Sequence, residues 1–176
     1  MGERVIAMII IRPEKPEDIA AIHHVVRHAF ERAAEADLVD LLRRNGKAAI
    51  SLVAEDNGRV IGHVLFSPVV IETSEGERHG IGLAPLAVWP ERQNEGIGLM
   101  LVRQGLIECR TARHPFAVVL GHPEYYPRFG FVPASRFGIK SEFEVRDEVF
   151  MVLELQNNGL PSCAGIVKYQ PEFSTV

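Results

Sequence analysis

One strand–helix–strand unit constrains the fold more than any other part of the sequence. The segment Gly80 to Val88 has the alternating pattern of a strand. Gly96 to Arg113 then carries a broad apolar face, of the kind that packs a helix against a sheet. "FAVVLG", Phe116 to Gly121, is apolar throughout and indicates a buried strand. Because two strands joined through a helix run parallel, the unit predicts the parallel pair of an α/β sheet.

The N-terminal half adds strands and helices to this unit. β-branched residues predict a first strand over Val5 to Arg12. Apolar residues at helical spacing predict one helix over 15–30 and a short second helix over 35–46. From Ile50 the apolar period changes to two on both sides of Asn57-Gly58, a strong hairpin signal, so antiparallel strands are expected there.

The C-terminal part is less regular. "PEYYPRFGF" predicts a short helical turn that ends at Gly130, and a late strand is expected over Val149 to Leu155. The tail to Val176 has only a weak pattern. The expected order is strand, two helices, three antiparallel strands, helix, strand, short helix and two strands. This order predicts a mixed central sheet flanked by helices.

Composition points to one domain and excludes some classes of ligand. A chain of 176 residues with 47% apolar residues buries one core, so we expect a single domain over 1–176. Against 23 acidic residues stand 19 basic ones, in no dense block, which argues against nucleic-acid and membrane surfaces. Two cysteines are too few for a secreted disulfide framework, and the apolar run near the N-terminus is too short to span a bilayer. A cytoplasmic protein is therefore expected.

Two glycines, Gly96 and Gly98, open the helix of the crossover unit. The first turn of a helix leaves N–H groups without partners and carries the positive end of the helix dipole, so it attracts phosphates. Glycine removes β-carbons that would hold such an anion away. A dinucleotide fingerprint would need a third glycine where Leu101 stands, and a P-loop would need Lys and Ser or Thr where Leu99 and Met100 stand. The sequence fits neither class.

The loop and a later motif together resemble the GNAT superfamily of N-acetyltransferases. "LAVWPERQNEGIG" resembles the acyl-CoA loop of that family, Gln/Arg-x-x-Gly-x-Gly/Ala after a strand that ends in L-x-V-x-P. "YPRFGF", Tyr126 to Phe131, resembles its second signature, Tyr-x-x-x-Gly-Phe. The resemblance covers about Arg12 to Leu155, so we expect a family core over about 5–155 and a C-terminal extension over 156–176.

The resemblance implies an acetyl-CoA-dependent transfer to a primary amine by direct attack in a ternary complex. The pyrophosphate would lie on the amides of 93–98, and the pantetheine arm would pair with the strand edge near Leu86 to Val88. The Val88 amide would hold the oxyanion, and Tyr126 would protonate the leaving thiolate. The residues implied for cofactor binding are Leu86, Ala87, Val88, Gln93, Asn94, Glu95, Gly96, Ile97, Gly98 and Tyr126.

The sequence leaves the roles of several other polar side chains undecided. The base that takes the proton of the amine could be His122, Glu124, Glu31 or Glu35. Any of Arg92, Arg103 and Arg128 could contact the third phosphate of the cofactor. His24 and His28 are spaced i,i+4, but no HExxH pattern or nearby cysteine accompanies them, so no metal site is expected.

Two other functions are carried as alternatives: a non-catalytic domain that senses acyl-CoA through the same loop, and a protein for another phosphate ligand. The sequence does not identify the acceptor amine. The residues that choose it are expected in Phe30 to Asn45, the hairpins and the tail. A homodimer through the last strands is left open.

Overall fold

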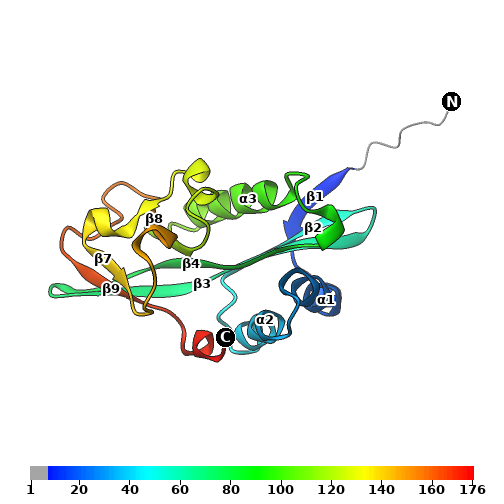
Figure 1. Cartoon of the computed structure of the whole chain (residues 1–176), viewed down its shortest axis with the longest axis horizontal. Helices are drawn as coiled ribbons and strands as arrows, with labels where there is room; N and C mark the ends of the chain where they lie inside the picture. Colours follow the sequence, from blue (N-terminus) through cyan, green and yellow to red (C-terminus); the bar gives the residue numbers. More distant parts are fainter. Residues whose placement is uncertain (1–7) are drawn as a thin grey trace.

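The computed structural model describes residues 8–176, in which nine strands form one mixed sheet (Figure 1). The sheet has the order β1-β2-β3-β4-β5-β8-β6, and β9 pairs with both β3 and β7. The strands are β1 (Ile9–Pro13), β2 (Ile50–Asp56), β3 (Arg59–Thr73), β4 (Gly76–Val88), β5 (Phe116–Leu120), β6 (Val132–Pro133), β7 (Ile139–Ser141), β8 (Phe150–Glu154) and β9 (Gly165–Lys168). The α-helices are α1 (Ile19–Phe30), α2 (Ala34–Arg44) and α3 (Ile97–Thr111). The 3-10 turns are η1 (Pro16–Asp18), η2 (Pro90–Arg92), η3 (Tyr126–Phe129), η4 (Ala134–Phe137), η5 (Asp147–Val149) and η6 (Pro171–Thr175).

The crossover unit and the hairpin are confirmed. β4 and β5 are parallel and joined through α3, while β2, β3 and β4 form an antiparallel series. Asn57 and Gly58 both have positive φ, 49° and 80°, as a tight turn between β2 and β3 requires.

The expected first strand and the C-terminal region need correction. The strand begins at Ile9, and residues 5–7 of the expected strand lie outside the described residues. Four strands follow η3 instead of two, and the tail contributes β9 and η6. Only β8 matches an expected range, and β6, β7 and β9 have just 2, 3 and 4 residues, too few to show a period. Pairing with neighbours stabilises them more than their own sequence does.

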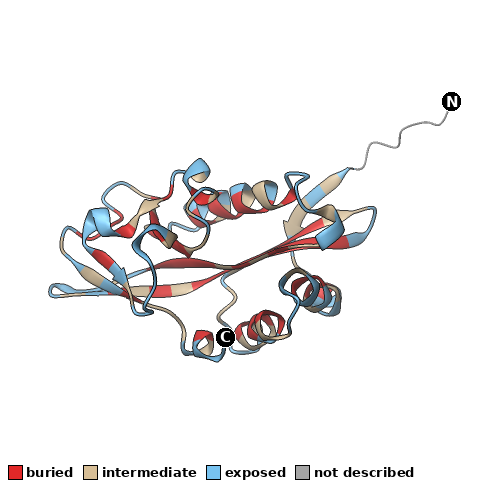
Figure 2. Ribbon diagram, viewed as in Figure 1, coloured by how far each residue is buried: buried red, intermediate tan, exposed pale blue. Residues whose placement is uncertain are grey.

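Helices cover both faces of the sheet. α3 packs on one face, and α1, α2 and η6 lie on the other (Figure 1). Figure 2 shows buried residues along the sheet and on the helix sides turned toward it. A further cluster around Phe116 and Phe150 fills the half of the sheet that contains β5, β8 and β9. Within residues 8–176, no helix combines the length and the apolar character needed to cross a bilayer.

His63 lies fully buried in the middle of β3, where its Nε2 shares a hydrogen bond of 2.8 Å with the Ser51 hydroxyl. Its Nδ1 has no partner among the described residues. Burial, with a smaller contribution from the charge of Arg43, lowers the pKa of His63 to about 3. The folded protein therefore holds this imidazole neutral.

The buried imidazole predicts a loss of stability in mild acid. Between pH 6.5 and pH 3 the unfolded chain binds a proton at His63, whereas the folded chain does not. The free energy of unfolding therefore falls as the pH falls. From pH 7.5 to pH 5.0, His63 should lower the free energy of unfolding by about 2 kcal/mol, measured by urea titration. His63→Gln should remove this contribution, whereas His79→Gln, at an exposed site, should keep it. An equal pH dependence in wild type and His63→Gln would contradict this account.

Candidate active site

β4 and β5 separate part-way along their length. They pair only where Ile81–Leu83 lies beside Ala117–Val119, while β4 continues to Val88 on its β3 side. The Trp89 amide donates to the Ile61 carbonyl at 2.8 Å, and the ladder alternates, so the backbone groups of Val88 point away from β3. The Val88 carbonyl accepts a hydrogen bond of 3.1 Å from Gln93 Nε2. The Val88 amide thus faces the opening between the two strands.

The loop before α3 presents a row of free amides. The row differs from the expected 93–98, because the Gln93 amide donates to the Pro90 carbonyl at 3.4 Å. None of the N–H groups of residues 94–99 donates to a backbone carbonyl of the described residues. Two positions in the loop, Asn94 and Gly96, have left-handed backbone, with φ of 64° and 83°. Arg92 holds the loop through ion pairs of 2.8 Å with both Asp56 and Glu95. A fixed row of N–H groups at a helix start can bind a phosphate or pyrophosphate.

The two glycines of this loop have different physical roles. An added Cβ at Gly96 would meet nothing within 4 Å, so glycine serves there for its left-handed conformation. An added Cβ at Gly98 would lie 2.9 Å from the hydroxyl of Tyr125. The sequence predicted that position 98 lacks a β-carbon so that an anion can approach the backbone. The contact with Tyr125 is a second reason for glycine at this position. This glycine also makes room for a side chain from η3's N-terminal cap.

Tyr125 is fixed from the other side by Arg128. The guanidinium lies 4.5 Å from the centre of the Tyr125 ring, and Arg128 Nε donates to the Tyr125 carbonyl at 2.9 Å. Burial raises the pKa of Tyr125, and the charge of Arg128 opposes this shift. The phenol is a neutral group at the start of α3.

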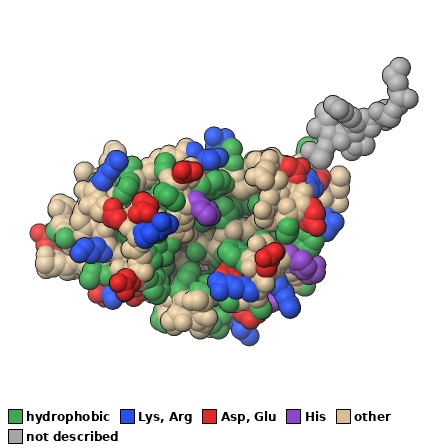
Figure 3. Space-filling model, in the orientation of Figure 1, with side chains coloured by type: hydrophobic (Ala, Val, Ile, Leu, Met, Phe, Trp, Pro, Cys, Tyr) green, Lys and Arg blue, Asp and Glu red, His purple; other side chains and the backbone are tan. Residues whose placement is uncertain are grey.

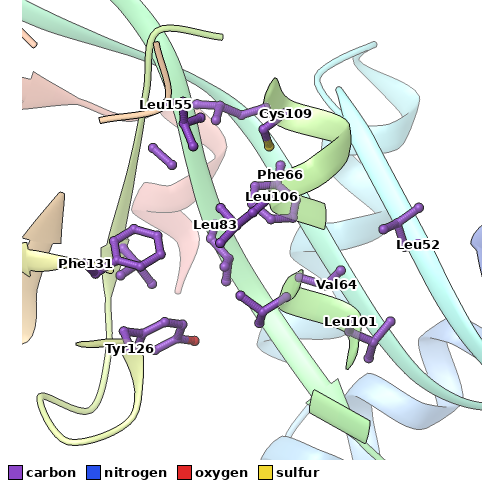
Figure 4. Close-up of a cluster of buried hydrophobic side chains, with 14 of the residues drawn as sticks. Leu52, Val64, Phe66, Leu83, Leu101, Leu106, Cys109, Tyr126, Phe131 and Leu155 are labelled. Atoms are coloured by element: carbon purple, nitrogen blue, oxygen red, sulfur yellow. The ribbon is translucent and has the colours of Figure 1, made fainter. Parts of the chain in front are cut away.

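Tyr126 begins η3 and is only 7% exposed. Its ring packs edge-on against Phe131, with centroids 5.8 Å apart, and against the backbone of Gly121. In Figure 4 its hydroxyl points away from Phe131, at the end of the cluster. Burial raises the pKa of Tyr126 well above its usual range, so the phenol keeps its proton at neutral pH.

These features line one cleft of about 1030 Å³. Figure 3 shows this side of the molecule hollowed near its middle, with hydrophobic side chains inside the hollow and charged ones around it. Of the residues expected to bind the cofactor, those that line the cleft are Leu86, Val88, Gln93, Asn94, Gly96, Ile97, Gly98 and Tyr126. Ala87 instead packs in the cluster between the sheet and the helices α1 and α2. The Glu95 side chain forms an ion pair with Arg92.

The candidates for the base and for the contact with the third phosphate differ in whether they line the cleft. Glu35 and His122 line the cleft, whereas Glu31 and Glu124 are exposed outside its lining. Among the arginines, Arg92 and Arg128 line the cleft and Arg103 does not. Within residues 8–176, no three His, Cys, Asp or Glu side chains are grouped so that they could share a metal ion.

Two lining residues were not identified individually from the sequence, although the tail as a whole was expected to help choose the acceptor. Gly121 directly follows β5 and contacts the Tyr126 ring, but a single glycine after a strand usually only marks a turn. Phe173 lies in the weakly patterned tail and reaches the cleft because η6 packs against α2. Their place in the cleft follows from contacts with distant segments, which the sequence does not show.

Known proteins are similar to this chain in sequence and in fold. Residues 10–134 match the family model described as "Acetyltransferase (GNAT) domain". "Uncharacterized N-acetyltransferase YhbS" of Escherichia coli K12 is 35% identical over 167 residues, which cover 94% of this chain and 99% of the relative. The crystal structure of E. coli YhbS in complex with CoA has a TM-score of 0.90 at 34% identity, covering 99% of this chain and 96% of that one. A GNAT family acetyltransferase from Brucella melitensis in complex with acetyl-CoA has a TM-score of 0.79 at 36% identity, covering 95% and 99%.

Proposed function

Because the chain belongs to the GNAT family of N-acetyltransferases, we propose that it transfers the acetyl group of acetyl-CoA to a primary amine by direct attack in a ternary complex. The observation that carries the proposal is the row of free amides at residues 94–99 beside the open edge of β4. The row suits the pyrophosphate of the cofactor, and the open edge suits an extended arm such as pantetheine.

Acetyl-CoA supplies the thioester in this reaction, and two groups of the chain act on it. The Val88 amide donates to the thioester oxygen, which becomes negative as the amine nitrogen attacks the carbonyl carbon. The carbon–sulfur bond then breaks, and Tyr126 gives its proton to the sulfur. The amine loses a proton on forming the amide, and water returns a proton to Tyr126. No enzyme nucleophile takes part.

Isothermal calorimetry and a free-thiol assay test this proposal. We expect the protein to bind acetyl-CoA with one site and to release free CoA when a suitable amine from a broad panel is present. Thermal stability should rise with acetyl-CoA more than with ATP or NAD. Absence of acetyl-CoA uptake would reject the proposal. Uptake without turnover on any amine would favour the acyl-CoA sensing domain.

Gly96→Ala separates the loop's role in binding from its role in folding. A side chain at φ of 83° costs about 1 to 2 kcal/mol, so the free energy of unfolding should fall by that amount. The strained loop should also bind acetyl-CoA about 10-fold more weakly by calorimetry, since its amides move. Gly46→Ala is the matched control, because Gly46 has φ of 70° and open space around it but lies outside the cleft lining. It should lose similar stability and keep its affinity for acetyl-CoA.

A further inference from the structure

The part of the cleft away from α3 is assembled from segments far apart in the sequence. The end of α1 contributes Phe30, the α1–α2 connection contributes Arg32, α2 contributes Glu35 and Leu38, and η6 contributes Phe173. η6 is held against α2 by a hydrogen bond of 2.8 Å from Asn45 to Glu172, and Phe173 is buried in the cluster with Leu38. The wall is apolar except for one arginine and one glutamate.

Glu35 is the one carboxylate among the side chains that line the cleft in the described part of the chain. It is 7% exposed and lies one helical turn before Leu38, which packs in the same cluster as Ala87 of β4. Its side chain therefore lines the same cleft as the β4 residues Leu86 and Val88. A buried carboxylate requires a cationic or hydrogen-bonding partner.

Arg32 is that partner in the structure. Its Nε donates to both carboxylate oxygens of Glu35 at 3.0 Å, and Nη2 also contacts the carboxylate. The Arg32 side chain is 62% exposed, so its guanidinium can turn into water at small cost. The Glu35 side chain is only 10% exposed, so its carboxylate cannot exchange Arg32 for bulk water as readily. One partner of the ion pair is thus exposed to water and the other is buried.

We propose that the acceptor is a primary amine with a compact apolar body and no negative charge, and that Glu35 binds its ammonium group in place of Arg32. This inference rests on the proposed acetyl transfer. The wall formed by Phe30, Leu38 and Phe173 suits an aliphatic or aromatic body. An anionic acceptor would meet a buried like charge, and the charge of Arg32 is already compensated by Glu35. Glu35 acts here as a recognition residue, which holds the nitrogen near the thioester before it loses its proton to water.

Three amines of defined charge test the acceptor class. Phenethylamine has one ammonium and an aromatic body, phenylalanine adds a carboxylate, and spermidine has several charges without an apolar body. The value of kcat/KM for phenethylamine should exceed those for the other two by about 10-fold or more. Calorimetry on the CoA-loaded protein should show the same order of binding, which does not depend on turnover.

Glu35→Gln tests the residue. It keeps the size of the side chain and removes its charge, so KM for phenethylamine should rise about 10-fold to 100-fold while the Kd for acetyl-CoA stays within about 2-fold. Asp37→Asn is the matched control, since Asp37 lies in the same helical turn but is exposed outside the cleft lining. It should behave as wild type.

Preference for phenylalanine or spermidine, failure of phenethylamine to bind or react, or equal behaviour of Glu35→Gln and Asp37→Asn would overturn the inference. In each of these cases normal acetyl-CoA binding, together with turnover of another amine from the panel, would leave the proposed acetyl transfer standing. Loss of acetyl-CoA binding in the wild-type protein would reject both.

Discussion

Replacing Tyr126 with Phe is expected to lower kcat by about 100-fold while the Kd for acetyl-CoA stays nearly unchanged. The substitution keeps the ring that packs against Phe131 and removes only the hydroxyl. A tyrosine hydroxyl already carries its proton at neutral pH, and burial raises the pKa of Tyr126 further, so the proton that the leaving sulfur needs is present. Initial rates from the free-thiol assay and calorimetry with acetyl-CoA measure the two quantities separately.

Tyr125→Phe is the natural control for this experiment. Tyr125 lies next to Tyr126, lines the same cleft and also loses one hydroxyl, but its hydroxyl lies against Gly98 at the start of α3. We expect its kcat to change by less than about 3-fold, because the proposed mechanism assigns the proton transfer to Tyr126 and not to Tyr125. An unchanged rate in Tyr126→Phe, or an equal loss in both variants, would remove Tyr126 from the mechanism.

Gly121→Ala should give the second largest loss of turnover, about 10-fold or more. An added Cβ would overlap the Tyr126 ring, so the ring must move away from its position in the cleft. The same overpacking should lower the free energy of unfolding by about 1 to 3 kcal/mol. The double variant with Tyr126→Phe should be no slower than Tyr126→Phe alone, since both changes act on one hydroxyl. Rates and urea titrations of the two single variants and the double variant measure these effects.

Gly80→Ala separates overpacking from catalysis. Its added Cβ would overlap the ring of Phe116, which lies in a core cluster outside the cleft lining. It should lose comparable stability and keep the wild-type kcat. A similar fall of kcat in Gly80→Ala and Gly121→Ala would show that overpacking, and not the position of Tyr126, controls turnover.

The sequence predicted the parts of the fold that depend on local signals. Asn57-Gly58 predicted a turn because few other residues accept positive φ, and the run Phe116–Leu120 predicted a buried strand because it is apolar throughout. Gly96 and Gly98 marked the loop before α3. The resemblance of "YPRFGF" to a family signature indicated Tyr126, which lines the same cleft as that loop.

Features that arise from contacts between distant segments could not be predicted in the same way. The reason for Gly98 depends on Tyr125, which approaches it from η3 and not from neighbouring sequence. Phe173 enters the cleft only because the tail packs against α2. Glu35 and Glu31 looked equivalent as acidic residues, and only the winding of the chain turns one inward and leaves the other in water.

The position of β9 determines the order in which this sheet can be completed. β9 pairs antiparallel with Val70–Thr73 of β3 and parallel with β7. Since it follows every other described strand in the sequence, a ribosome makes both of its neighbours before it makes β9 itself. Until then Val70–Thr73 of β3 and the strand β7 lack the backbone partners that β9 provides. This end of the sheet can therefore be completed only after residues 165–168 have been made.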